Sequence, residues 1–409
     1  MIKRLNIQKV LLILAIIAGL ILPTACQTKG MKKNDNESGS AVTVSSTNST
    51  TSTDSTEATS ETTHFYSSDK IALASTPEEY WDMIRFHGVA LVYRDGEIQY
   101  TLEKGFADRE TQTPTTINTV YEYGSITKQV TAVAIMQLVE EGKLSTEDTL
   151  DQYIPEYTYA SEITIHQLLN MTSGVIDYVL EGPLGINLMN TSSINTSTLV
   201  SDVKAIATTP ITHEDLLAMV NPFPLHFTPG TEYHYSNTNY YFLGMIIERL
   251  SGMTFSEYVE KNIFEPLNID NLYFDNSELT SYGGIQLGEI FISLPSQDET
   301  ISYSVGGMCG SAEALLAWEK CVISRCLLTE ASWNEIYDGG VFNYGYGWQI
   351  HDDYVMHSGS TLGYNTTVIV NAEADEVVIV LSNTQSLGFT DERPSSEMVG
   401  ERLYAFLNE

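Results

Sequence analysis

The stretch YGSITKQVTAVAIMQLVEEGKL, residues 123–144, carries the most informative pattern in this chain. After Lys128 the apolar residues recur at helical spacing until Gly142, so we expect a helix that begins near Ser125. Residues three apart on a helix share a face, which places the Lys128 amine within reach of the Ser125 hydroxyl. Such an amine can activate a hydroxyl that is unreactive at its own pKa. The alternative interpretation is a capping serine followed by an exposed lysine.

The composition excludes some classes of function. The 409 residues include 53 acidic and 20 basic side chains, which gives a formal net charge of −33 at pH 7. So acidic a surface repels the phosphates of nucleic acids and anionic lipids. We therefore expect no nucleic-acid partner, and membrane association only through a lipid anchor. The charge also has a simpler interpretation, which is solubility.

The first 26 residues have the features of a secretory signal. Basic residues precede an apolar stretch, residues 10–22, which is shorter than the ~20 residues that a membrane-spanning helix needs. The stretch leads into LPTAC, ending at Cys26, and resembles the lipobox of bacterial lipoproteins, whose cysteine is lipidated. Pro23 departs from that pattern, so the alternative is ordinary cleavage and free secretion. In both cases we expect the protein to act outside the cytoplasm.

Residues 27–66 are rich in Ser, Thr, Asn and acidic residues and contain few apolar ones. Such a segment cannot bury enough surface to offset the entropy of folding, so we expect a disordered tether. The predicted organisation is a signal segment with a lipobox-like cysteine (1–26), a disordered linker (27–66) and one folded domain (67–409).

Three further cysteines, Cys309, Cys321 and Cys326, do not indicate a disulfide scaffold, because an odd number leaves a thiol unpaired. Cys321 and Cys326 lie too close together in a predicted helix for easy bridging geometry. We interpret all three as small buried apolar side chains. No Cys/His spacing indicates zinc, and His166 and His234 have no spacing that needs an explanation. We therefore predict no metal site and no cofactor.

The apolar periodicity predicts two sets of strands separated by helices. Strands at residues 89–93 and 97–102 flank an Asp-Gly pair, which is a strong hairpin signal. Strands return between residues 346 and 381, a last helix follows at about 395–407, and residues 145–274 are mostly helical or loop. This order predicts an α/β fold of the α+β type, in which an antiparallel sheet built from both chain ends is flanked by helices and a mainly helical subdomain is inserted.

Tyr235 and Asn237 form a second motif, two residues apart after the turn signature FTPG. A phenol near an ammonium can shuttle a proton. An amide can hydrogen-bond a substrate carbonyl and the Lys128 amine at once. The alternative is that both are ordinary loop residues.

A third motif, His357-Ser358-Gly359-Ser360, ends a predicted strand. Gly359 permits close approach of a substrate to the backbone. The free N–H groups of an edge strand can pair with an acyl group, and one of them can complete an oxyanion hole with the N–H of Ser125. The alternative for His357 is a strand-end histidine with no role in chemistry.

Taken in order, Ser-x-x-Lys, Tyr-x-Asn and His-x-Gly resemble the motifs of the serine hydrolases of the class C β-lactamase and penicillin-binding protein family. This family includes D-alanyl-D-alanine carboxypeptidases and esterases. Flanking segments agree over about residues 75–408, among them TIHQLLNMTSG, SVGGMCGSAEALLAWEK and HSGSTLGYNT. The resemblance implies a β-lactamase/transpeptidase-like fold and an acyl-enzyme formed on Ser125.

The resemblance also implies the roles of the other residues. Lys128 takes the Ser125 proton, directly or through Tyr235, and Tyr235 is the general acid and base. Asn237 orients Lys128 and the substrate.

The third motif is expected to bind the substrate. The resemblance implies that His357 and Gly359 line the opposite wall, that His357 tunes Tyr235, and that the N–H groups of Ser125 and Ser360 form the oxyanion hole. The β-lactamases of the family usually carry lysine where this chain has His357, which is often neutral at pH 7. This departure resembles the carboxypeptidase and esterase branches more than the cephalosporinases.

We therefore expect an extracytoplasmic serine hydrolase that forms an acyl-enzyme on a peptide or ester, D-alanyl-D-alanine carboxypeptidase-like, with a small molecule or cell-wall peptide as its substrate. One alternative is an esterase or weak β-lactamase on the same site. The other is a non-catalytic module that binds cell-wall peptides. Nothing in the sequence specifies an oligomer.

Overall fold

The computed structural model describes residues 68–181, 203–287, 289–386 and 389–408. The predicted signal segment with Cys26 and the predicted linker lie outside these residues. Within the described part, no helix combines the length and the apolar character that a bilayer crossing requires.

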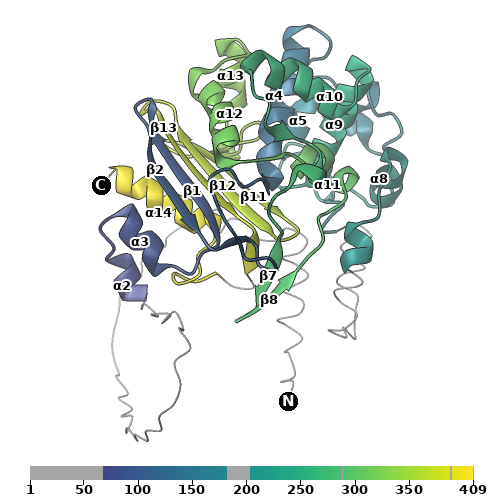
Figure 1. Cartoon of the computed structure of the whole chain (residues 1–409). Helices are drawn as coiled ribbons and strands as arrows, with labels where there is room; N and C mark the ends of the chain where they lie inside the picture. Colours follow the sequence, from purple (N-terminus) through teal and green to yellow (C-terminus); the bar gives the residue numbers. More distant parts are fainter. Residues whose placement is uncertain (1–67, 182–202, 288, 387–388, 409) are drawn as a thin grey trace, which may run out of the picture.

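A six-stranded antiparallel sheet lies at the centre of the fold, with the strand order β10-β11-β12-β13-β1-β2 (Figure 1). Its strands are β1 (Gly88–Arg94), β2 (Glu97–Lys104), β10 (Gln349–Ile350), β11 (Val355–Thr361), β12 (Tyr364–Asn371) and β13 (Glu376–Ser382). β1 pairs with β13 along its whole length, from Gly88 opposite Ser382 to Arg94 opposite Glu376. The predicted fold class, with a sheet assembled from distant parts of the chain, is confirmed.

The β1–β2 hairpin forms at the Asp-Gly pair, as predicted. Asp95 and Gly96 have φ of 54° and 84°, the left-handed conformations that a two-residue hairpin turn requires. The pairing register shifts between Val92 and Tyr93, and such a bulge increases the local twist of the sheet.

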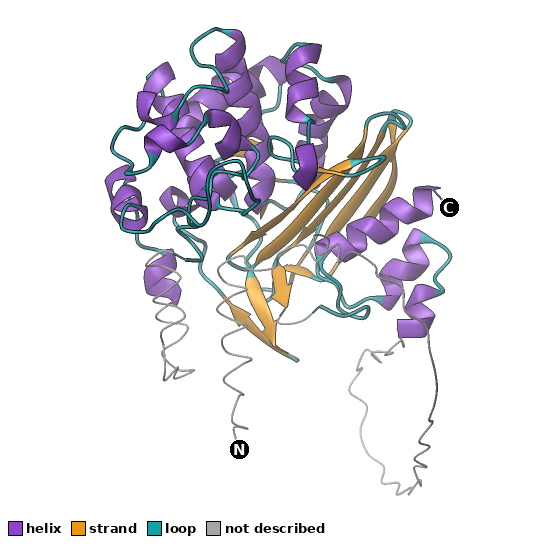
Figure 2. Ribbon diagram, turned by 180° about the vertical axis from the view of Figure 1, so that it is seen from behind, coloured by secondary structure: helices purple, strands orange, loops and turns teal. Residues whose placement is uncertain are grey.

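The two faces of the sheet contact different layers. Along β1, Val89, Leu91 and Tyr93 belong to the large core shared with the helical region, whereas Ala90 and Val92 belong to a smaller core. This alternation is the two-residue period of a strand that is buried on both faces. Figure 2 shows the helical region and the helices from the two ends of the described chain on different sides of the sheet.

Helices from both ends of the described chain cover the smaller core. They are α2 (Ser68–Ala72), α3 (Pro77–Met83) and α14 (Ser396–Asn408). Trp81 of α3 and Leu403 of α14 pack in the same cluster as Val92. The N-cap of α3 is Thr76, whose hydroxyl accepts a hydrogen bond from the Glu79 N–H at 3.1 Å, which satisfies one of the free N–H groups at the start of the helix.

The other described helices form the region between β2 and β10. Among them are α4 (Thr127–Glu140), α5 (Ile165–Leu169), α8 (His213–Val220), α9 (Asn237–Ser251), α10 (Phe255–Val259), α11 (Glu299–Gly306), α12 (Ala312–Ser324) and α13 (Glu330–Ile336). α4 is the central one: residues 127–136 are all buried, and α9, α10, α11 and α13 pack around it. A helix buried on all sides holds its first turn in a fixed position, which matters for Ser125.

Short strands tie the ends of these elements together. β3 (Phe106–Asp108) pairs with β4 (Thr113–Pro114), β5 (Tyr121–Glu122) and β6 (Leu272–Tyr273) flank β9 (Cys309–Gly310), and β7 (Gly284–Leu287) lies between β8 (Ile290–Ser293) and β14 (Thr384–Ser386). β14 runs parallel to β7. The β5–β9 pairing matters most for the site, because it fixes the chain just before Ser125.

The strand predicted to begin at residue 346 is shorter than expected. Tyr346 and Trp348 are fully buried in the large core, and Gly347 between them has φ 85°. A Cβ on Gly347 would lie 2.8 Å from the Lys128 carbonyl oxygen. The aromatic side chains therefore pack against the helical region, and β10 begins only at Gln349.

A disulfide joins Cys321 and Cys326, which corrects the expectation that these cysteines are not bridged. α12 ends at Ser324, and Arg325 takes φ 52° as its C-cap. The chain turns back there and brings the two cysteine Cα atoms to 5.1 Å, inside the normal range for a disulfide. The expectation assumed one helix through both residues. Cys309 is free and buried, as expected.

We expect a Cys321→Ala, Cys326→Ala double variant to lose about 2 kcal/mol of unfolding free energy, because the bridge closes a short loop in the unfolded chain. Equilibrium unfolding in urea, with and without a reductant, measures this loss. Reductant should bring the wild type to the stability of the variant and leave the variant unchanged. A reductant effect of equal size on both proteins would contradict the assignment.

Candidate active site

Ser125 lies in a 3-10 turn, Gly124–Ile126, that leads directly into α4. α4 itself begins two residues after Ser125, slightly later than the sequence predicted. Thr127 fixes the turn, because its hydroxyl donates to the Gly124 carbonyl at 2.7 Å and accepts from the Met308 N–H at 3.1 Å. Gly124 has φ 59°, which glycine adopts without a steric cost.

Lys128 is a fully buried amine in contact with the Ser125 hydroxyl. Its Nζ lies 2.9 Å from Ser125 Oγ, 2.9 Å from Asn237 Oδ1 and 2.8 Å from the Val305 carbonyl oxygen. Burial lowers the pKa of Lys128 to about 7, against an opposing effect of the Asp177 charge. A neutral amine has two N–H groups and one lone pair. The two carbonyl oxygens accept the N–H groups, so the lone pair is left for the Ser125 hydroxyl.

Tyr235 reaches the same hydroxyl from the loop before α9. Its OH donates to Ser125 Oγ at 2.8 Å. Burial raises the pKa of Tyr235 well above its usual value, against the opposing effect of the hydrogen bond to Ser125, so the phenol is protonated at neutral pH. Ser125 Oγ is therefore held between a proton acceptor and a proton donor. Both Ser125 and Tyr235 are partly exposed.

A buried carboxylate that the sequence did not single out holds Asn237. Asp177 Oδ2 accepts from the backbone N–H of Asn237 at 2.7 Å and from its Nδ2 at 2.8 Å. Asp177 Oδ1 accepts from the N–H groups of Val179 and Leu180 at 2.7 and 3.0 Å. These bonds orient the amide so that Oδ1 faces Lys128. No motif or spacing in the sequence connects Asp177 with this position.

The Val305 carbonyl is a second partner that no side-chain motif could reveal. It belongs to α11, whose regular geometry breaks at Tyr303, with φ 35° and ψ −128°. Thr131 of α4 donates to the Ser304 carbonyl at 2.7 Å. The kinked segment is thereby held against α4, and the carbonyl groups of Ser304 and Val305 both point at α4.

Strand β11 runs beside the turn that carries Ser125. β12 pairs with β11 along its length, whereas β10 pairs only with Val355 and Met356. Beyond Met356, the outer edge of β11 has no strand partner among the described residues. An open strand edge at this place can align an extended substrate by backbone hydrogen bonds.

Two glycines let the backbones meet here. A Cβ on Gly359 would overlap the Tyr123 carbonyl oxygen, and a Cβ on Gly124 would lie 2.7 Å from the Ser360 nitrogen. The close approach that the sequence assigned to the substrate is thus made by the protein's own chain. It brings Ser360 next to the turn that carries Ser125. The Ser360 hydroxyl accepts from Gln385 Nε2 at 2.6 Å.

His357 is 2% exposed, and both of its ring nitrogens are used within the chain. Nδ1 donates to the Ser358 carbonyl at 2.7 Å, so Nε2 accepts from the Tyr344 hydroxyl at 3.0 Å. Burial, with a smaller effect of the Lys128 charge, lowers the pKa of His357 to about 3. The ring is therefore neutral and has no nitrogen left for a substrate.

His357 and Tyr344 both lie beside the Tyr235 ring, so the predicted influence of His357 on Tyr235 has two possible routes. The two ring centroids lie 6.2 Å apart, and Tyr344 packs edge-on against Tyr235 at 6.1 Å. His357 holds the Tyr344 hydroxyl, and Tyr344 supports the Tyr235 ring. No motif in the sequence pointed to Tyr344.

Comparison with known proteins places the chain in a family. A model of the beta-lactamase family matches residues 73–397. The chain belongs to the beta-lactamase family. A penicillin-binding protein of Bacillus subtilis (strain 168) is 27% identical over 331 residues, 74% of this chain and 69% of that protein. The putative penicillin-binding protein PbpX of the same strain is 25% identical, over 81% of this chain and 77% of its own length.

A solved structure supports the same assignment. The penicillin binding protein from Bacillus halodurans superposes with a TM-score of 0.65 at 26% identity, over 80% of this chain and 98% of that one. The chain is a serine hydrolase of the penicillin-binding protein and beta-lactamase class. The predicted family, fold class and enzyme class are confirmed.

We expect Gly359→Ala to slow acylation of Ser125 by about 100-fold, because the added methyl displaces β11 from the Ser125 turn and misplaces the reacting groups. Reaction with a fluorophosphonate under single-turnover conditions measures the rate. Gly306→Ala is the matched control, since its Cβ would lie 3.6 Å from Gly124, an ordinary contact. Equal rates for both folded variants would show that the close approach at Gly359 is not needed.

Proposed function

We propose that this protein is an extracytoplasmic hydrolase that forms an acyl-enzyme on D-alanyl peptides, as D-alanyl-D-alanine carboxypeptidases do. One observation carries the chemistry: Ser125 Oγ lies 2.9 Å from the Lys128 amine and 2.8 Å from the Tyr235 phenol. Nucleophilic attack by the hydroxyl needs a base to take its proton, and departure of an amine needs an acid to give one. The Lys128 amine and the Tyr235 phenol can supply these two functions.

In the acylation step, Ser125 Oγ attacks the substrate carbonyl carbon while its proton passes to Lys128 Nζ. The N–H groups of Ser125 and Ser360 stabilise the negative oxygen that forms. Collapse of the tetrahedral intermediate breaks the scissile bond, and Tyr235 gives its proton to the departing nitrogen. The products are an ester on Ser125, an ammonium on Lys128 and a phenolate on Tyr235.

Deacylation restores the starting state. Water gives a proton to the Tyr235 phenolate as its oxygen attacks the ester carbonyl. Ser125 Oγ then leaves and recovers the proton held by Lys128. Asn237 keeps the amine in place throughout, because its own amide is fixed by Asp177. In this cycle Lys128 is the direct base, and Tyr235 acts as the acid first and as the base second.

The shape of the site and the names of the relatives support this substrate class. The open edge of β11 suits an extended peptide, and the relatives are named penicillin-binding proteins. The second candidate is an esterase or weak β-lactamase activity on the same residues. The neutral His357 favours the esterase, because this residue offers no positive charge to a substrate carboxylate.

The proposed location outside the cytoplasm has support from the folded part. A disulfide such as Cys321–Cys326 persists in oxidising compartments and is rare where thiols are kept reduced. The apolar N-terminal stretch and Cys26 support export with a lipid anchor, with free secretion as the alternative. The described residues supply no membrane-spanning helix.

We expect the wild type to be labelled covalently by fluorescent penicillin and to release D-alanine from a D-alanyl-D-alanine peptide. Ser125→Ala should lose turnover by on the order of a million-fold, because the nucleophile is gone. Mass spectrometry of the digest should place the acyl group on the peptide that contains Ser125.

A panel with p-nitrophenyl esters and nitrocefin separates the candidates. Ester cleavage without release of D-alanine would favour the esterase. Absence of labelling by penicillin and by fluorophosphonate in a folded sample would point to the non-catalytic binding module.

We expect kcat/KM to rise tenfold per pH unit below about pH 7 and to level off above it, because only neutral Lys128 can accept the serine proton. Tyr235, Tyr240 and His357 also face this amine. The pKa values of both phenols are raised and that of His357 is lowered, so none of the three titrates near pH 7.

Lys128→Arg is the diagnostic variant for this profile. A guanidinium does not lose its proton in this range, so the variant should lose about 10²–10⁴-fold in rate and show no step near pH 7. A wild-type step that persists in the variant would assign the titration to another group.

A further inference from the structure

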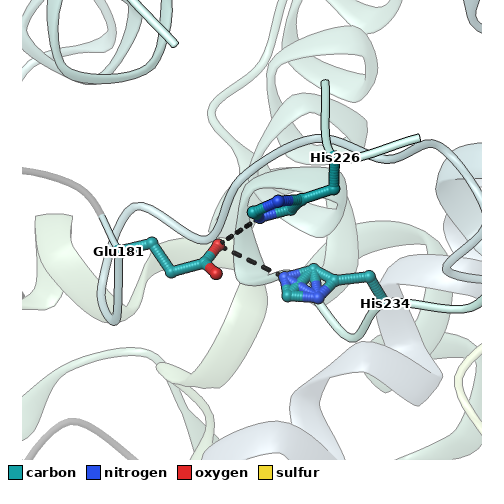
Figure 3. A group of neighbouring side chains, drawn as sticks. All are labelled: Glu181, His226 and His234. Carbon is teal, nitrogen blue, oxygen red and sulfur yellow. Dashed lines mark hydrogen bonds and ion pairs between the residues drawn. The ribbon is translucent and has the colours of Figure 1, made fainter. Parts of the chain in front are cut away.

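Two loops next to the active site bring together a carboxylate and two imidazoles (Figure 3). Glu181 comes from the loop after α5, and His226 and His234 come from the loop between α8 and α9. His226 Nε2 lies 2.9 Å and His234 Nε2 3.2 Å from Glu181 Oε2. In Figure 3 the carboxylate points at both rings, which lie one above the other.

The spacing of these atoms fits one metal ion. The three ligand atoms lie within 4.8 Å of one another. Zinc binds histidine nitrogen at about 2.0–2.1 Å, so neighbouring ligands of a tetrahedral ion lie roughly 3.3 Å apart. The two nitrogen-to-oxygen distances are already close to that value. Two imidazoles and one carboxylate suit zinc and similar transition metals better than calcium or magnesium, which prefer oxygen ligands.

The loops that carry the ligands are held in place by backbone bonds. The N–H of His226 donates to the Gly174 carbonyl at 2.8 Å, and the N–H of His234 donates to the Met171 carbonyl at 3.0 Å. A Cβ on Gly174 would lie 2.7 Å from the Phe227 carbonyl oxygen. The fold therefore positions the backbone of the three residues in advance, so that binding of an ion would cost little conformational entropy.

We propose that Glu181, His226 and His234 bind a divalent transition-metal ion of the zinc type, with water completing the coordination. Each of the three side chains is 30–40% exposed, so the ion can enter from solvent and keep a water ligand. The spacing of the three residues in the sequence gave no sign of this, because two separate loops contribute them.

The proposed site would join the two loops that supply the active site. His234 directly precedes Tyr235, and the Asp177 N–H donates to Glu181 Oε2 at 2.9 Å. Asp177 in turn holds Asn237, which contacts Lys128. A bound ion would thus fix both the phenol and the amide, although it contacts neither Ser125 nor the substrate. We assign it a positioning role, separate from the chemistry on Ser125.

Isothermal titration of the metal-free protein with zinc tests the proposal. We expect one ion per chain, with affinity on the order of 100-fold weaker in His226→Gln, His234→Gln and Glu181→Gln, because each variant removes one ligand. Ser125→Ala should bind zinc like the wild type, which separates this result from the test of the hydrolase. Binding that is absent, or unchanged in all three ligand variants, would overturn the proposal and leave an ion-pair network only.

His213→Gln is the matched control for the titration. His213 pairs with Glu248 at 2.9 Å and is 36% exposed, but no third ligand joins this pair among the described residues. We expect the control to keep the affinity of the wild type. A loss equal to that of the ligand variants would place the ion elsewhere.

A second measurement needs no variant. Zinc should protect His226 and His234 of the wild type from diethyl pyrocarbonate and leave the reactivity of His213 unchanged. The three side chains have similar exposure, so a difference in protection reports coordination and not access. Equal modification of His226 and His234 with and without zinc would refute the site even if the variants fail to fold.

Discussion

The burial of one amine is the constraint on which the rest of the site depends. Lys128 is removed from water and meets two carbonyl oxygens, one from Asn237 and one from Val305. A charged amine would have to give up its hydration for this place, so its pKa falls to about 7 and the neutral form becomes available. Helix α4, the kinked α11 and the Asp177 loop all serve to hold these few atoms.

The second requirement is close contact between backbones that are far apart in the sequence. Gly124 and Gly359 have no side chains, and the Ser125 turn therefore lies directly against β11. His357 on the same strand is buried, and its ring accepts a hydrogen bond from the Tyr344 hydroxyl. Because burial keeps the ring neutral, His357 adds no charge to the site. His357 of the third motif thus supports the Tyr235 phenol through Tyr344. Gly359 of the same motif lets β11 lie in contact with the turn that carries Ser125.

The sequence predicted those features that depend on short-range signals. The Asp-Gly hairpin, the helix after Lys128 and the sheet from distant strands were all recognisable, as were the motif residues that the fold brings around Ser125. Asp177, Tyr344 and the Val305 carbonyl were not, because they reach the site only through tertiary packing. The Cys321–Cys326 bridge was missed because a left-handed residue ends α12 between the two cysteines. The cluster of Glu181, His226 and His234 was missed because two loops far apart in the sequence build it.

The strand order has a consequence for the assembly of the site during synthesis. Within the sheet, β11 and β12 are joined to β1 only through β13, which follows both of them in the sequence. Ser125 is synthesised early, whereas Ser360 belongs to β11, and β13, which joins that side of the sheet to β1, is synthesised later still. Until β13 is synthesised, β11 and the Ser125 turn therefore lack the sheet that holds them side by side in the folded protein.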